Sequence, residues 1–275
     1  MGKCAGFLRR YYASRRPPYC YDYQNPDMIQ AYIYTKLFNP INRRRIEASL
    51  RGNLIGQAEL KDMNYILYPL HTEPELVLAQ FARPYLNQIE VIRNISLSMP
   101  VGMSLLVKEH PMMLGRRSCG YYKKVLEIPN VKFVDFRLSS EAVLAHARLV
   151  VIIRGAIGLE SVIRRKPVVS LGKSMFDLLP SCMFMPCRSL YDLPGAIQGM
   201  LDGYQYDGQG LVRYLAAVMK GSVPLNLVSD LLGKKGRFRS EMVWGDDDFA
   251  GHPHLDVLAD YMIGRVRAGG GERGA

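Results

Sequence analysis

The stretch Leu149-Val-Val-Ile-Ile-Arg-Gly-Ala-Ile-Gly-Leu-Glu-Ser161 decides the fold class of this chain. Its first five residues are all apolar, with no polar residue alternating between them. Such a run is typical of a strand that is buried on both faces of a sheet. The residues from Gly158 onward predict a helix. A buried strand followed directly by a helix is the repeating unit of parallel α/β sheets.

The same unit recurs along residues 65–201, where short apolar runs alternate with helix-like segments. The runs predict six strands, at 65–69, 104–107, 131–134, 149–153, 167–171 and 182–185. The segments between and after them predict helices at 84–98, 121–127, 139–147, 158–165 and 190–201. With right-handed crossovers, this order predicts an α/β fold with a doubly wound, mostly parallel sheet of the Rossmann-like type.

Residues 1–61 differ in composition from the rest of the chain. They contain eleven basic residues against four acidic ones, many tyrosines and four prolines. The pattern predicts amphipathic helices at 28–38 and 41–50 and no strand, so we expect a basic helical arm or linker. We expect residues 62–222 to form the Rossmann-like domain and residues 223–275 to form C-terminal helices and a flexible tail. Further helices are predicted at 210–220, 225–232 and 256–267.

Composition excludes several classes of protein. The chain has 275 residues, 48% of them hydrophobic, which suffices for a sizeable core. Its net charge of +11 favours anionic partners: nucleotide phosphates, nucleic acid or an acidic membrane face. The five cysteines are scattered and form no CxxC pair, which favours a reduced, cytoplasmic protein. No apolar run approaches the roughly 20 residues of a spanning helix, and no signal peptide is evident.

Reactive residues follow four of the predicted strands. In an open parallel sheet, ligands bind beyond the carboxyl ends of the strands. After the first strand come His71, Glu73 and Glu75, which suit acid–base work or the orientation of sugar hydroxyls. After the second come Lys108, Glu109 and the pair His110-Pro111. Lys108 and an imidazole N–H would both donate to a phosphate, and the proline fixes the direction of the turn.

The fourth and fifth strands also end in candidate ligand-binding residues. After the fourth, Gly155 and Gly158 permit close approach of a ligand, the helix start offers N–H groups, and Glu160 suits a ribose diol. The loop matches neither GxGxxG nor GxxxxGK[ST], so close helix–sheet packing explains the glycines equally well. After the fifth strand, Gly172 and Lys173 form a small basic loop that would face the same crevice.

Other chemistries have little support in the sequence. His252 and His254 follow three aspartates, but the segment lacks helical ligand spacing, so we expect no metal site. No GxSxG elbow occurs, and no cysteine has an evident base. The arginine clusters at 15–16 and 43–45 are more typical of solvated faces, so we do not expect nucleic-acid binding.

Several motifs, in their order and spacing, resemble one known family. They are Tyr65-Ile-Leu-Tyr-Pro-Leu-His-Thr-Glu-Pro-Glu75, Pro100-x-Gly102 leading to Val107-Lys-Glu-His-Pro111, Ile128-Pro-Asn-Val131, and Gly155-x-x-Gly158-x-Glu160 followed by Lys166-Pro-Val168. They resemble bacterial capsule and surface-polysaccharide biosynthesis proteins, which are GT-B-type glycosyltransferases. The resemblance covers about residues 60–200 and indicates the C-terminal, nucleotide-sugar-binding half of that fold.

The resemblance implies transfer of a sugar from a nucleotide-sugar donor to a glycan or lipid-linked acceptor, with no essential metal and no other cofactor. It implies that His110 and Pro111 contact donor phosphate, that Glu160 contacts the ribose, and that His71 and Glu75 lie on the donor side. The candidate catalytic residues are His71, Glu75 and His110. The candidate nucleotide-sugar-binding residues are Lys108, His110, Pro111, Ser139, Arg154, Gly155, Gly158, Glu160, Ser161, Gly172 and Lys173.

The chain departs from the family pattern in two ways. Ala156 stands where a threonine is usual, and Arg154 stands where a small or hydroxyl residue is expected. The arm is also too short to form the N-terminal Rossmann domain of a GT-B enzyme, so we expect a second Rossmann domain or a protein partner. Two alternatives stay open: a non-catalytic nucleotide-binding subunit or remnant, and a relative of sugar-nucleotide epimerases. The basic arm is a candidate for peripheral contact with the inner face of a membrane.

Overall fold

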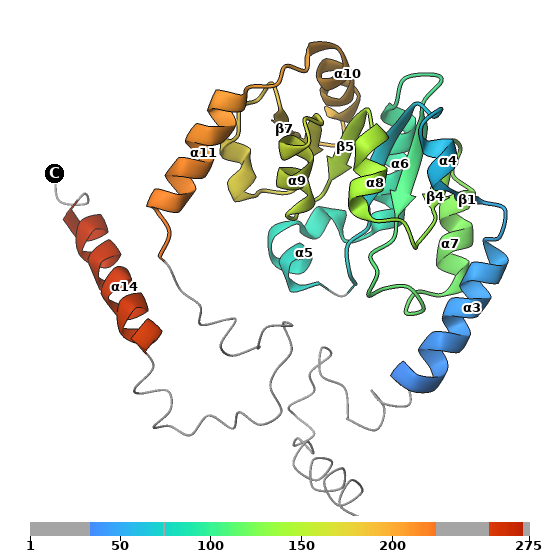
Figure 1. The fold of residues 1–275 in the computed structure, drawn as a ribbon, viewed down its shortest axis with the longest axis horizontal. Coiled ribbons are helices and arrows are strands. Elements are labelled where there is room, and N and C mark those ends of the chain that lie inside the picture. The colour runs from blue at the N-terminus through green and yellow to red at the C-terminus, as the bar shows by residue number, and fades with distance from the viewer. Residues whose placement is uncertain (1–33, 74, 224–252, 272–275) are drawn as a thin grey trace, which may run out of the picture. The chain divides into compact units, whose positions relative to one another are not determined.

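The computed structural model describes residues 34–73, 75–223 and 253–271. Their centre is a seven-stranded sheet in which every pair of neighbouring strands is parallel (Figure 1). The strands are β1 (Leu54–Ile55), β2 (Tyr65–Pro69), β3 (Ser104–Lys108), β4 (Val131–Val134), β5 (Leu149–Ile152), β6 (Val168–Ser170) and β7 (Phe184–Pro186). The predicted α/β fold with a doubly wound parallel sheet is therefore confirmed.

The order of the strands places a switch point in the middle of the sheet. The order is β1-β4-β3-β2-β5-β6-β7, so the chain winds in one direction from β2 and in the other from β5. These two strands are neighbours, with Ile66 paired to Leu149 and Leu67 to Val150. Loops that leave adjacent strands on either side of a switch point diverge, which opens a crevice beyond their carboxyl ends.

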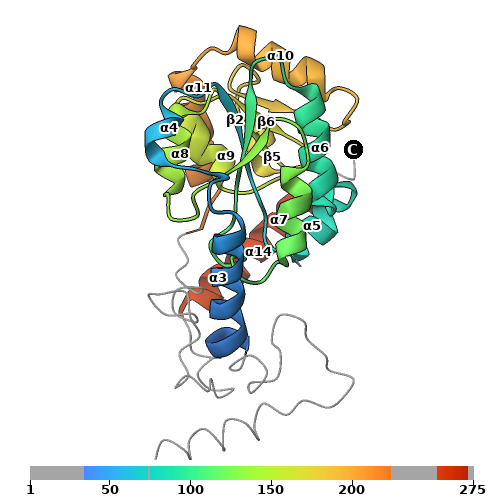
Figure 2. The same ribbon diagram turned by 90° about the vertical axis from the view of Figure 1, so that its right-hand side faces the viewer.

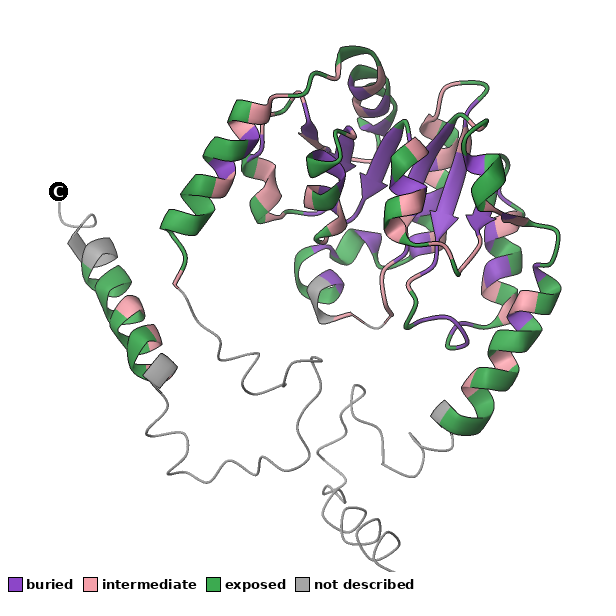
Figure 3. Ribbon diagram, viewed as in Figure 1, coloured by how far each residue is buried: buried purple, intermediate pink, exposed green. Residues whose placement is uncertain are grey.

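Helices cover both faces of the sheet. Figures 1 and 2 show α6 (Gln88–Ser98), α7 (Cys119–Leu126) and α10 (Leu193–Gly203) on one face, and α4 (Gln57–Leu60), α8 (Ser140–His146) and α9 (Ile157–Ile163) on the other. The strands between them are buried throughout most of their length (Figure 3). This is why their sequences are continuously apolar rather than alternating.

The described chain contains further helices and short helical turns. They are α3 (Asn39–Ser49), α5 (Leu76–Phe81), α11 (Gly208–Lys220) and α14 (Pro253–Gly271), with a π-helix at Tyr34–Phe38 and 3-10 turns at Arg83–Tyr85 and Met175–Leu178. Ile46 of α3 is fully buried, and the amide of Asn42 donates to the carbonyl of Gly115 at 2.7 Å. The described residues from Gln209 onward belong to a second unit, in which the Tyr261 hydroxyl donates to the Gly221 carbonyl at 3.0 Å.

Three features differ from the sequence predictions. Residues 1–61 were expected to contain no strand, but β1 lies among them and pairs with β4. Because β1 is only two residues long, its sequence carries little strand signal. Helices α4 and α5 were not predicted, and the helix predicted at 84–98 begins only at Gln88, after the 3-10 turn. The helix predicted at 225–232 and the start of that at 28–38 lie outside the described residues. Among the residues described, no helix is both long enough and apolar enough to span a membrane.

Candidate nucleotide-binding site

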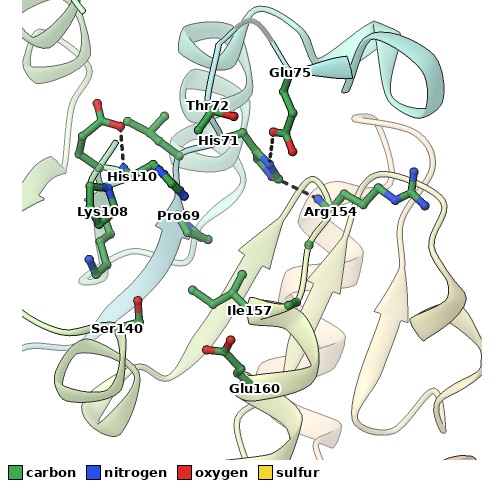
Figure 4. Close-up of a pocket in the computed structure, with 15 residues that line it drawn as sticks. Pro69, His71, Thr72, Glu75, Lys108, His110, Ser140, Arg154, Ile157 and Glu160 are labelled. Carbon is green, nitrogen blue, oxygen red and sulfur yellow. Dashed lines mark hydrogen bonds and ion pairs between the residues drawn. The ribbon is translucent and has the colours of Figure 1, made fainter. Parts of the chain in front are cut away.

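A cavity of about 320 Å³ lies at the carboxyl ends of β2, β3 and β5, which is the switch point of the sheet. Segments 69–75, 108–111 and 154–160, each following one of these strands, supply most of its lining, and Figure 4 shows their side chains around one space. The predicted site residues that line it are His71, Glu75, Lys108, His110, Pro111, Arg154, Gly155 and Glu160. Topology therefore brings together residues that are up to 89 positions apart, from His71 to Glu160.

His110 is held so that its Nε2 is a hydrogen-bond donor. The backbone N–H of Met112 donates to Nδ1 at 3.2 Å, and the N–H of His110 itself donates to Glu109 Oε1 at 2.6 Å. Because Nδ1 is an acceptor, the proton of the neutral imidazole is assigned to Nε2. Burial lowers the pKa of His110, and the charge of Lys108 lowers it further, against the carboxylate of Glu75. The ring is therefore a neutral N–H donor at pH 7.

Lys108 places an amino group in the cavity without a protein partner. It ends β3 and is only 6% exposed, yet its side chain makes no hydrogen bond or ion pair within the part of the chain that the structure describes. Burial lowers the pKa of Lys108, although the carboxylate of Glu109 opposes this. An ammonium that is partly shielded from water gains from pairing with an anion. An anionic ligand in the cavity would provide that partner.

His71 forms an oriented imidazole–carboxylate pair with Glu75. Nδ1 of His71 lies 3.1 Å from Glu75 Oε2, and Nε2 lies 3.4 Å from the backbone nitrogen of Arg154 (Figure 4). In this arrangement Nδ1–H donates to the carboxylate, and the Nε2 lone pair accepts from the backbone N–H of Arg154. Burial lowers the pKa of His71, while Glu75 acts in the opposite direction. A neutral, oriented imidazole of this kind can accept a proton at Nε2 when it gives up the bond from the Arg154 N–H.

The segment after β5 supplies a carboxylate and a glycine to the cavity. Glu160, in the first turn of α9, is exposed and lines the cavity. Gly155 has a φ of +115°, which L-residues with side chains rarely adopt, and a Cβ there would lie 3.8 Å from the ring of His71. Arg154 extends away from Lys108 and His110 in Figure 4, and its guanidinium lies 4.4 Å from the centre of the Phe81 ring.

Arg117, which is not among the predicted site residues, ties two cavity segments together. It is 5% exposed and donates to Glu109 Oε2 at 3.0 Å and to Glu73 Oε2 at 2.5 Å. Its third contact is to the carbonyl oxygen of His71. Tyr122 also donates to Glu109, at 2.9 Å. One guanidinium therefore fixes the segment after β2 against the segment after β3.

Gln88 is a second residue missing from the prediction. Its Oε1 accepts from the backbone N–H of His71 at 2.8 Å, and its Nε2 donates to the carbonyl of His71 at 3.3 Å and to Glu73. The amide is 1% exposed and lies on α6. It holds the backbone of His71 from both sides, so the imidazole enters the cavity in a fixed direction.

Five predicted binding residues do not line the cavity. Ser139 caps α8 by accepting from Ala142 N–H at 3.1 Å; its neighbour Ser140 lines the cavity instead. Ser161 donates to the Ile157 carbonyl, and Lys173 is exposed elsewhere. Gly158 and Gly172 allow close packing, because a Cβ would lie 2.6 Å from Ile152 and 2.7 Å from the Ile153 carbonyl, respectively. Their roles in ligand binding are not supported by these positions.

The fold is a Rossmann-like, doubly wound α/β sheet, and the cavity at its switch point lies where ligands bind in sheets of this kind. The sequence profile of one family, described as capsule polysaccharide biosynthesis protein, matches residues 12–179. The chain belongs to this family. No curated protein sequence matches it significantly.

Three solved structures to which the chain is similar have low sequence identity with it. The putative UDP-N-acetylglucosamine 2-epimerase of Listeria monocytogenes is 18% identical with a TM-score of 0.38, over 60% of this chain and 46% of that one. KpsC of Thermosulfurimonas dismutans, a beta Kdo 2,7 transferase, is 15% identical with a TM-score of 0.37, over 71% and 68%. Anabaena Alr3699/HepE, solved with UDP-glucose, is 13% identical with a TM-score of 0.37, over 64% and 52%. This chain spans about half the length of the first and third, and at these TM-scores the likenesses carry no functional argument.

Proposed function

We propose that the cavity binds the diphosphate of a nucleotide sugar and that the chain is the donor-binding half of a glycosyltransferase of capsular or surface polysaccharide synthesis. The observation that carries this proposal is a pair of donors on one segment. Lys108, a largely buried residue, and the Nε2–H of His110 line one cavity, and neither side chain has an ion pair within the described residues. Glu160 lines the same cavity and would accept hydrogen bonds from a ribose diol.

The proposed chemistry uses these groups in separate roles. In sugar transfer, the bond between sugar C1 and the donor phosphate oxygen breaks, and its electron pair stays on the phosphate. The acceptor hydroxyl oxygen forms the new bond to C1 and gives up its proton. Lys108 and His110 stabilise the charge that grows on the leaving diphosphate. His71 accepts the proton at Nε2, in place of the hydrogen bond from the Arg154 N–H, and Glu75 holds the imidazole in the required tautomer. The positive charge comes from the chain itself, so we expect no metal requirement.

The acceptor and its site are expected to come from outside this domain. The residues described here form one Rossmann-like sheet, and its cavity is open at the strand ends that would face a second domain. We propose that a second Rossmann domain or a protein partner completes the site and presents a glycan or lipid-linked acceptor. The purified chain would then bind the donor nucleotide but turn over nucleotide sugars only together with that partner.

Binding of UDP, as a probe for the donor diphosphate, tests the cavity. We expect Lys108→Met and His110→Ala each to weaken UDP binding about tenfold or more, since each removes a hydrogen bond to a charged group. Isothermal titration calorimetry measures this directly. Lys132→Met is the matched control, because Lys132 is exposed on β4 outside the cavity.

Unchanged UDP affinity in both cavity variants would overturn the proposal. The same titration in EDTA tests the metal requirement, and a loss of binding there contradicts the expected independence of metal. A panel of nucleotide sugars then separates the alternatives, because binding without turnover, even with the partner present, favours a non-catalytic subunit.

We also propose that the basic arm touches an anionic membrane, where lipid-linked acceptors would lie. Arg44 and Arg45 of α3 are exposed, and apolar Leu37, Phe38 and Ile41 near its start are exposed as well. Exposed cations beside apolar side chains are typical of surfaces that bind acidic lipids. We expect the protein to float with vesicles that contain phosphatidylglycerol, and Arg44→Glu with Arg45→Glu to float less. Equal flotation with purely neutral vesicles would contradict this charge-driven contact.

A further inference from the structure

A second cavity lies at the opposite edge of the sheet. It has a volume of about 630 Å³ and shares no lining residue with the first cavity. Its walls are the residues that precede β5 and β6, the carboxyl ends of α8 and α10, and the turn before β3. Nothing in the proposed sugar transfer uses this end of the domain.

Positive charge dominates the lining of this cavity. Arg148, Arg165 and Lys166 line it, against one carboxylate, that of Asp202, which accepts from the Gln198 amide at 2.6 Å. Neither Arg148 nor Arg165 forms an ion pair within the described residues. Burial lowers the pKa of Lys166, and the charge of Arg148 lowers it further. These cations repel one another in the absence of an anion.

Arg165 occupies a position at which glycine is normally found. Its φ is +57°, and it follows the C-cap of α9. The N–H of Arg165 donates to the Val162 carbonyl and that of Lys166 to the Ser161 carbonyl, each at 2.9 Å. These two bonds define a Schellman motif, whose left-handed residue is usually glycine because a side chain there costs about 1 kcal/mol. Arginine rather than glycine at this position therefore lowers the stability of the fold.

The apolar part of the lining shows what kind of molecule would fit. Met103 and Met200 are buried beside the cations, and Val101 is fully exposed at the rim. Tyr204 also lines the cavity, and its hydroxyl is buried without a hydrogen-bond partner among the described residues. The cavity thus combines an apolar wall with unpaired positive charge.

Helix polarity explains only part of this cluster. Cations commonly lie near carboxyl ends of helices, where they interact with free carbonyls. Lys166 does so, donating to the Ala145 carbonyl in the last turn of α8 at 2.8 Å. Arg165 makes no such bond; its guanidinium lies 4.9 Å from the centre of the Tyr206 ring. Arg148 and Arg165 therefore remain available to an incoming anion.

We propose that this second cavity binds a small molecule that carries an oxyanion on an apolar body. The guanidinium groups of Arg148 and Arg165 would hold the oxyanion, since they present paired donors that match phosphate or carboxylate. Met103 and Met200 would contact the apolar body. A ligand here would contact α8, α10 and the turn that follows α9, and thereby both faces of the sheet, at the end far from the donor cavity.

The test uses phenyl phosphate as the probe, with benzoate and inorganic phosphate as separate arms, on the full chain. Amide NMR shifts resolve the two cavities, and we expect phenyl phosphate to shift Arg148, Arg165 and Lys166. Benzoate identifies whether a carboxylate suffices, and inorganic phosphate shows whether the apolar body adds affinity. Arg165→Gly should weaken binding at these amides about tenfold or more. Because glycine suits this backbone, the variant should melt no lower than the wild-type protein.

Asn130→Gly is the matched control. Asn130 also has a left-handed φ, of 61°, but lies outside the second cavity. It should keep the affinity of the wild-type protein. The proposal is overturned if all three probes shift only residues around Lys108 and His110, or if Arg165→Gly binds phenyl phosphate as tightly as the wild-type chain. Neither result bears on UDP binding at the first cavity, so the two proposals are tested separately.

Discussion

Arginine is seldom buried unless its guanidinium is fully paired, and Arg117 meets this condition with two carboxylates and a backbone carbonyl. Glu109, the carboxylate at 3.0 Å, is itself only 3% exposed. Burial raises the pKa of Glu109, and the charge of Arg117 lowers it again. Removing the arginine would leave this carboxylate without its cation in the interior, and the segments after β2 and β3 would lose their common anchor.

We therefore expect Arg117→Met to lower the free energy of unfolding by about 3–5 kcal/mol, the cost of breaking a buried ion pair. Arg117→Lys should cost less, because lysine keeps the charge but cannot make the forked contacts. Urea denaturation measures both. Arg116→Met serves as the control, since Arg116 is exposed and its loss should change stability by no more than about 0.5 kcal/mol. Equal stability of the Arg116 and Arg117 variants would contradict the anchoring role.

At the scale of the element, α9 is held to the sheet by a glycine. A Cβ on Gly158 would lie 2.6 Å from Ile152 Cδ1 and 3.2 Å from the ring of Phe184. We expect Gly158→Ala to destabilise the fold by about 1–3 kcal/mol through overpacking. UDP affinity should stay unchanged, because Gly158 does not line the cavity. Thermal or urea unfolding together with calorimetry separates the two effects.

For a glycine in α10, we expect substitution by alanine to have the opposite effect on stability. Gly199 is exposed within the helix and a Cβ there meets nothing within 4 Å. Gly199→Ala should therefore stabilise the protein by about 0.5–1 kcal/mol through helix propensity. If Gly158→Ala proved as benign as Gly199→Ala while lowering UDP affinity, Gly158 would be a ligand-binding residue after all.

The elements also show why part of the site was predictable. The strands are buried on both faces, so their apolar runs were unmistakable, and the residues after them fell at the switch point. Gln88 had a usable signal: with Val91, Ile92 and Ile95 it forms the buried stripe of α6, and a polar residue in such a stripe needs a partner. No sequence signal marked Arg117, because it lies in a loop whose course depends on contacts between residues distant in sequence. Gly158 and Gly172 were predicted to bind the ligand but instead allow close packing. The sequence does not separate these two roles, because both require a residue without a side chain.

At the scale of the whole molecule, the site depends on topology more than on any single motif. His71 and Arg154 belong to loops 83 residues apart, and they meet because β2 and β5 are neighbours. His110 joins them because β3 lies on the other side of β2. Burial at this convergence lowers the pKa of both imidazoles. The titration of these two histidines is therefore linked to the stability of the entire sheet.

This linkage predicts how stability changes with pH. In the unfolded chain both histidines titrate near about 6.5, whereas in the folded chain His71 and His110 do so at lower pH. Below about pH 6.5 the unfolded state binds protons that the folded state does not, so the free energy of unfolding falls as pH decreases. The slope is at most about 1.4 kcal/mol per pH unit for each histidine.

Urea unfolding between about pH 7.5 and 5.5 measures this slope. The range stops there because Glu109, whose pKa is raised by burial, acts in the opposite direction in more acidic solution. Replacing His71 and His110 by glutamine should flatten the dependence, since neither position then binds a proton in either state. A wild-type protein that becomes more stable on acidification over this range would show that the two rings are protonated in the folded state. The neutral donor assigned to His110 and the neutral acceptor assigned to His71 would then both be wrong.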